Sequence, residues 1–183
     1  LEGAFGKSKT LAMAERIRAI NPLCQVTEIE DFVSLETLED IFDKRFDCVI
    51  DAIDQARVKA AMIARCTKAE IPIVTAGAAG GQTDPTRIRI ADLSRTIQDP
   101  LLAKVRARLR KENGFPRDPK KKFGVSAVFS TEPARYPTGD ASCDHSSHLN
   151  GLHCAGYGSS VCVTASFGFF AAAEALRQLA PAG

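Results

Sequence analysis

The stretch that most constrains the fold is a strand–helix–strand pattern at residues 46–77, FDCVIDAIDQARVKAAMIARCTKAEIPIVTAG. Its first part, FDCVIDAI, is a nearly continuous apolar run that ends in acidic residues, which is typical of a parallel strand buried on both faces. The alanine-rich segment QARVKAAMIARCTKA predicts a helix, and IPIVTAG predicts a second buried strand. Two strands joined by a helix lie parallel in one sheet, so this stretch predicts an α/β fold.

The rest of the chain continues this alternation. We predict helices at 9–20, 35–43, 101–114 and 159–180, and strands at 25–29, 87–93 and 125–132. The order of elements predicts a doubly wound, Rossmann-like sheet. We expect residues 1–98 to belong to a nucleotide-binding α/β unit. Residues 99–183 would add a basic helix, a strand, a crossover loop and the closing helix of the same domain.

Composition narrows the function classes. The chain has 183 residues, a formal net charge of +2 and 45% hydrophobic residues, which suits one globular domain and no strong global attraction to nucleic acid. Its six cysteines are scattered without paired spacing, which favours a reducing cytoplasm over a disulfide framework. We find no signal peptide and no apolar run long enough to span a membrane. The chain begins without Met and close to a helix, so we expect an N-terminal part to be missing.

Two acidic residues mark the predicted carboxyl end of the first buried strand. Asp51 and Asp54 stand where ligands bind in open α/β sheets, and such acids hold Mg²⁺ on a polyphosphate or hydrogen-bond a nucleotide. Arg57 and Lys59, one turn later, are placed to neutralise phosphate charge. The alternative is that Asp54 only caps the following helix.

Two further segments carry phosphate-binding residue types. Lys9, in GKSK, precedes a helix, and helix N-termini bind phosphate, although a lysine there is often only solvated. The basic helix carries Lys104, Arg106, Arg108 and Arg110 and is followed by further cations at 111, 117 and 120–122. This density predicts a contact with a phosphate backbone; the alternative is a solvated helix face.

All three histidines and two cysteines lie in CDHSSHLNGLHC, residues 143–154. These are zinc-ligand residue types, but their spacing matches no zinc finger and the chain has no CxxC pair. The sequence therefore favours a loop over a zinc site.

Several runs resemble the ubiquitin-activating-like adenylating superfamily, the ThiF/MoeB-type enzymes. They are Gly6-x-x-Lys9, INP at 20–22, DAID at 51–54 followed by Arg57, IPIVTAG, and FGFFAAAEAL. A closer resemblance, to the tRNA threonylcarbamoyladenosine dehydratases, rests on MAERIRAINP, VIDAIDQARVKAAMIARC, GAAGGQTDPTRI, DLSRTIQDPLLAKVRARLR, VFSTE and TASFGF. These runs span nearly the whole chain.

The resemblance implies a cytoplasmic homodimer that uses ATP and Mg²⁺ to adenylate the carboxylate of N6-threonylcarbamoyladenosine in tRNA, followed by ring closure with loss of water. It implies that Lys9 contacts the ATP phosphates and that Asp54 binds Mg²⁺ and positions the α-phosphate. It also implies that Phe32 packs on adenine and that Asp51 shapes the pocket. The family's asparagine after the second acid is Gln55 in this chain.

The family's Gly-rich nucleotide loop, ribose-binding acid and partner arginine do not occur in these residues, so we expect this chain alone to be inactive. Cys154 matches a cysteine of the dehydratase branch, beside His153, where its pKa would be lowered. It would either form a thioester, exchange sulfur with a cysteine-desulfurase partner, or be dispensable. The alternatives to the dehydratase are an adenylating activator of a ubiquitin-like sulfur carrier and a non-catalytic dimerising fragment.

Overall fold

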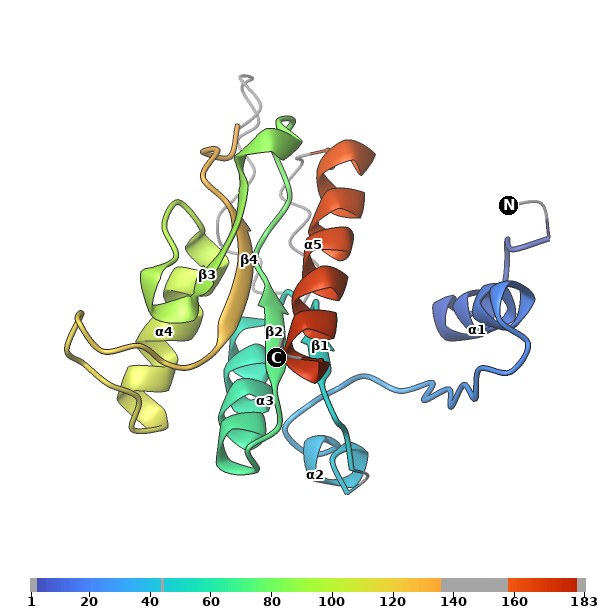
Figure 1. Cartoon of the computed structure of the whole chain (residues 1–183), viewed down its shortest axis with the longest axis horizontal. Coiled ribbons are helices and arrows are strands. Elements are labelled where there is room, and N and C mark those ends of the chain that lie inside the picture. Colours follow the sequence, from blue (N-terminus) through green and yellow to red (C-terminus); the bar gives the residue numbers. More distant parts are fainter. Residues whose placement is uncertain (1–2, 44, 136–157, 181–183) are drawn as a thin grey trace, which may run out of the picture.

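A computed structural model describes residues 3–43, 45–135 and 158–180. Its core is a four-stranded mixed sheet with helices on both faces (Figure 1). The elements in chain order are α1 (Lys9–Ile20), α2 (Leu38–Ile41), β1 (Val49–Asp51), α3 (Ala56–Lys68), β2 (Ile73–Ala76), η1 (Pro85–Arg87), β3 (Ile88–Asp92), η2 (Leu93–Arg95), α4 (Pro100–Glu112), β4 (Ser126–Ser130) and α5 (Val161–Leu179).

The sheet has the strand order β1-β2-β4-β3. Strands β1, β2 and β4 are parallel, with Val49 opposite Ile73 and Val74 opposite Ser126. Strand β3 runs antiparallel to β4 at the edge of the sheet. The predicted α/β fold is confirmed, and the sheet is mixed.

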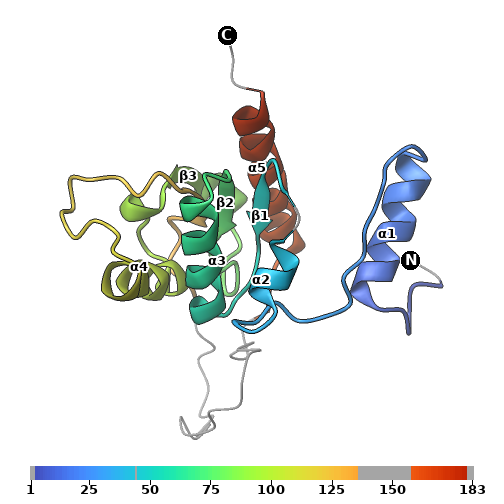
Figure 2. The same cartoon turned by 90° about the horizontal axis from the view of Figure 1, so that it is seen from below.

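Two apolar layers hold the helices to the sheet. Figure 2 shows α3 and α4 on a different side of the sheet from α5. Helices α3 and α4 cover one face, where Ile63, Leu102 and Leu109 are fully buried. Helix α5 covers the other face through Val163, Phe167 and Ala171, packed on Val74 and Val128. Burying an apolar side chain of this size contributes about 1.5–3 kcal/mol, so these layers fix the position of the strand ends.

The N-terminal segment differs from its prediction. Residues 25–29 form no strand, so that prediction is wrong, and the helix predicted at 35–43 is limited to Leu38–Ile41. Helix α1 stands apart from the sheet in both views (Figures 1 and 2) and buries only Ala14. Alternating apolar residues make a strand only where a neighbouring strand completes the hydrogen bonds, and in the described part of the chain none lies beside 25–29.

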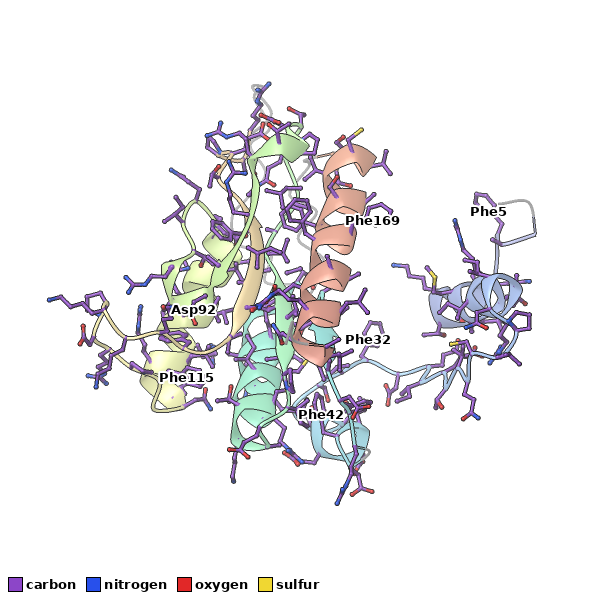
Figure 3. All side chains as sticks on the ribbon, in the orientation of Figure 1. Phe5, Phe32, Phe42, Asp92, Phe115 and Phe169 are labelled. Atoms are coloured by element: carbon purple, nitrogen blue, oxygen red, sulfur yellow. The ribbon has the colours of Figure 1, made fainter. Side chains whose placement is uncertain are left out.

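Side chains along the chain reflect this division (Figure 3). Phe42 packs in the core under α3, whereas Phe5 and Phe32 on the N-terminal segment are 99% and 85% exposed. Phe169 on α5 points away from the sheet and is also exposed. None of the described helices is long and apolar enough to cross a membrane.

Candidate functional site

The carboxyl ends of β1 and β2 form the candidate site, because both parallel strands finish at the same edge of the sheet. Strand β1 ends at Asp51, a four-residue connection at 52–55 follows, and α3 begins at Ala56. Strand β2 ends at Ala76 and leads into the glycine-rich turn 77–81. This edge therefore brings together the DAID segment and the GAAGG segment.

A buried lysine fixes the geometry of this edge. The Lys59 side chain is fully buried, and its Nζ donates to Asp51 Oδ2 at 2.8 Å, Thr75 Oγ1 at 3.1 Å and the carbonyl oxygen of Ala76 at 3.0 Å. Thr75 Oγ1 also donates to Asp51 Oδ2 at 2.7 Å. Burial lowers the pKa of Lys59 from its usual value, and the charge of Asp51 beside it opposes that fall. Lys59 thus ties the end of β1 to the end of β2, and the prediction that it neutralises phosphate charge is wrong, because its side chain is fully buried and bound to protein oxygens.

Asp51 serves this internal network. It is fully buried, and its second oxygen, Oδ1, accepts from the backbone N–H of Ile53 at 3.0 Å. Both carboxylate oxygens are therefore occupied within the protein. Asp51 was predicted to take part in ligand binding. In the structure it is buried away from solvent and helps to hold the ends of β1 and β2 together.

Asp54 has the opposite environment. It is exposed, and it has no hydrogen-bond partner among the described residues. The N-cap of α3 is Gln55, whose side chain makes no capping hydrogen bond, so the structure gives no support to the alternative in which Asp54 only caps this helix. Asp54 and Arg57 are both exposed near the start of α3 and are available to bind a ligand.

Two other predicted contacts lie elsewhere in this structure. Lys9 is the first residue of α1, which stands apart from the sheet (Figure 1). Phe32 lies on the exposed segment between α1 and α2 (Figure 3). The structure does not bring either residue to Asp54, and their roles stay predictions from the resemblance. Cys154 and the CDHSSHLNGLHC segment lie outside the described residues.

A third acid, which the sequence analysis did not assign to the site, holds the glycine-rich turn. Asp99 is buried; its Oδ1 accepts from the N–H of Leu102 at 2.8 Å as the N-cap of α4, and its Oδ2 accepts from the N–H of Ala78 at 2.9 Å. Burial raises the pKa of Asp99, and the hydrogen bonds from Leu102 and Ala78 oppose that rise. The Asp99-Pro100 pair was the available signal, because Asp at the N-cap followed by Pro starts a helix.

Glu132 anchors the far end of the same turn. Its Oε2 accepts from the backbone N–H groups of Thr83 and Asp84 at 3.0 and 2.9 Å. The hydrogen bond from Asp84 is the main reason that the pKa of Glu132 lies below its usual value. Its position after β4 carried no sequence signal, since the carboxylate meets residues about fifty positions earlier in the chain.

The predicted basic footprint divides into two sets. Arg106 donates to Thr96 Oγ1, and Arg110 donates to the carbonyl oxygen of Pro116 and lies 5.1 Å from the centre of the Phe123 ring. Lys104 is exposed, and Arg108 pairs with Glu112 at 2.9 Å on the surface. The four cations thus do not form one binding face, because Arg106 and Arg110 are used to hold the segments around α4.

Metal ligands are sparse in the part of the chain that the structure describes. Within 3–43, 45–135 and 158–180, no three His, Cys, Asp or Glu side chains cluster as a metal site would require. Mg²⁺ in nucleotide sites needs only one or two carboxylates, since phosphate oxygens and water supply the remaining ligands. The exposed carboxylate of Asp54 fits that requirement.

Comparison with known proteins gives the family. The ThiF family model matches residues 2–182. The chain is 49% identical over 180 residues to the tRNA threonylcarbamoyladenosine dehydratase of Haemophilus influenzae and 47% identical over 184 residues to that of Escherichia coli. Each alignment covers 98% of this chain, and 68% and 69% of the two relatives.

Solved structures agree with this result. The crystal structure of the Escherichia coli tRNA N6-threonylcarbamoyladenosine dehydratase in complex with ATP matches with a TM-score of 0.81 and 45% identity, over 95% of this chain and 64% of that one. Its complex with AMP matches with a TM-score of 0.80. The chain thus spans about two thirds of the length of these relatives. With the family model matched over nearly all of its length, the chain belongs to the ThiF family.

Proposed function

We propose that the full-length protein uses ATP to cyclise N6-threonylcarbamoyladenosine in tRNA. In the first step a carboxylate oxygen of the nucleoside attacks the α-phosphorus of ATP, and pyrophosphate leaves. In the second step the neighbouring nitrogen attacks the activated carbonyl carbon, AMP leaves and a proton is lost. The net change in the nucleoside is the loss of one water. Because the nitrogen nucleophile is in the same molecule, proximity lowers the barrier to ring closure.

The observation that carries this proposal is the free Asp54 carboxylate on a turn that Lys59 and Asp51 hold in place. A Mg²⁺ ion held there would neutralise charge on the phosphates of ATP. Arg57, the second residue of α3, adds a cation three residues after Asp54. The two relatives carry the dehydratase name, and a solved neighbour binds ATP, which supports the assignment of this edge to a nucleotide.

The remaining parts of the proposal rest on the resemblance alone. They are the homodimer and the role of Cys154 in exchange with a cysteine desulfurase. The Mg²⁺ ion is supported in addition by the exposed carboxylate of Asp54, and the cytoplasmic location by the scattered cysteines.

The direct test is nucleoside mass spectrometry on tRNA incubated with the full-length protein, ATP and Mg²⁺. Wild-type protein should convert the linear nucleoside to the cyclic form with release of AMP. Asp54→Asn should lower kcat/KM about a hundredfold, since it removes a charged group that positions the reacting phosphate. Asp40→Asn, which changes an exposed acid on α2, should leave the rate unchanged. Equal rates for Asp54→Asn and wild type would remove Asp54 from the mechanism, and no cyclic product with wild type would refute the function.

A further inference from the structure

The two flanks of α4 differ in what their cations contact. Arg106 and Arg110 are four residues apart and share the flank that faces η2 and the following loop, where both donate to protein oxygens. Lys104, Arg108 and Lys111 are spaced by four and three residues, so they share the opposite flank. We call this second set the outer flank of α4.

One member of the outer flank, Arg108, borders a groove. A cavity of about 460 Å³ lies between α3 and α4, with Ala60, Ala61 and Leu35 among its lining residues. Arg57 at the start of α3 and Arg108 of α4 also line it. The groove thus has a cation on each side, Arg57 from α3 and Arg108 from α4.

The charges of this flank are available to a partner. Lys104 and Lys111 are exposed and have no ion-pair partner among the described residues. Two acids reduce the positive electrostatic potential of this surface. Glu112 pairs with Arg108, and the charge of Glu36 lies near Arg57. The Arg108–Glu112 pair is on the surface, with side chains 36% and 45% exposed, and such pairs open at little cost.

We propose that the sugar–phosphate backbone of RNA docks on the outer flank of α4, with Arg57 contacting it from across the groove. Three cations over about 10 Å of helix give the spaced positive charge that a phosphate backbone neutralises. This inference rests on the proposed function, which makes tRNA the substrate, and names where the tRNA lies. Arg106 and Arg110 instead donate hydrogen bonds to protein oxygens and do not contact the RNA.

The test measures binding of labelled, refolded total tRNA to the full-length protein between 50 and 300 mM salt, values chosen to cover the range in which phosphate contacts are screened. The first variant is Lys104→Ala, Arg108→Ala, Lys111→Ala. Its matched control is Lys120→Ala, Lys121→Ala, Lys122→Ala, which removes the same charge from the exposed loop after α4. That loop lies on the η2 side, since Arg95 donates to the carbonyl oxygen of Lys120 at 2.9 Å.

The flank variant should bind tRNA about tenfold or more weakly at 0.1 M salt, and its log–log salt slope should fall by about two to three. The loop variant should change both quantities much less. Glu112→Gln should bind tRNA more tightly, because it frees Arg108 and removes a repelling charge; it also tests the inference if the triple variant folds poorly. Thermal melting checks the fold of each variant.

A loop variant that weakens binding as much as the flank variant would overturn the inference, as would a Glu112→Gln protein with unchanged affinity. A wild-type protein with no measurable tRNA binding at 50 mM salt would do so too. If the flank variant binds tRNA weakly as expected, but wild type forms no cyclic nucleoside, the proposed function fails and the docking surface stands.

Discussion

Replacing Lys59 by Met should destabilise the protein, because it leaves one buried negative charge without its positive partner. Methionine has nearly the length of lysine and fills the same space, so the change mainly removes the ammonium group. In the native protein that group donates to Asp51, Thr75 and Ala76, and neither Lys59 nor Asp51 is exposed to water. Lys59→Met therefore leaves the Asp51 carboxylate buried without a positive partner.

The expected loss in the free energy of unfolding is about 3–5 kcal/mol, the usual cost of removing one member of a buried ion pair. Domains are stable by only about 5–15 kcal/mol, so the loss should be large in any unfolding assay. The double variant Lys59→Met, Asp51→Asn removes both charges and should recover part of it, with a coupling of about 0.5–3 kcal/mol.

The assay is urea unfolding followed by circular dichroism at pH 8 and pH 5. At lower pH the unpaired carboxylate in Lys59→Met can take up a proton and lose its charge, so the destabilisation should be smaller at pH 5 than at pH 8. Lys68→Met, an exposed lysine at the end of the same helix, should change stability by less than about 0.5 kcal/mol. A loss in Lys59→Met no larger than in Lys68→Met, or one that the double variant deepens, would refute the role assigned to this pair.

Two further perturbations test how α4 and α5 are held to the rest of the fold. Gly77→Ala would place a Cβ 1.9 Å from Asp99 Oδ2, so it should displace the cap of α4. We expect it to lower the free energy of unfolding by about 2–4 kcal/mol in thermal unfolding. The control Gly168→Ala on α5, with open space around it, should raise that free energy by about 0.5–1 kcal/mol. Hydrogen bonds from Arg177, and then from Ser126 and Gln178, lower the pKa of Glu174 from 4.5 to about 2, so its stabilisation is present above pH 4.5 and is lost as the pH falls towards 2. Glu174→Gln should lower the free energy of unfolding by about 1–2 kcal/mol at pH 7 and weaken this pH dependence. The control Glu112→Gln should do neither. An acid-unfolding curve for Glu174→Gln that overlays wild type would contradict this reasoning.

The strand–helix–strand unit could be predicted because its signals are local. Three patterns each predict one element: the apolar run before Asp51, the alanine-rich segment and IPIVTAG. The structure has β1, α3 and β2 at those places. The strand predicted at 25–29 failed because a strand needs a partner, and a partner is a non-local property. The mixed sheet was also not predicted, since the direction of β3 depends on how the chain returns beside β4.

The sequence by itself determined the fold class, the family resemblance and the position of the acidic strand end, because these depend on the order and spacing of residues along the chain. Only the tertiary structure separated Asp51 from Asp54, since burial and hydrogen bonding give one carboxylate to Lys59 and leave the other to solvent. It likewise divided the cations of α4, because the helix turns Arg106 and Arg110 toward the protein and Lys104 and Lys111 toward water. Burial, partners and facing direction arise from contacts between residues far apart in the chain, and the order of residues alone does not contain them.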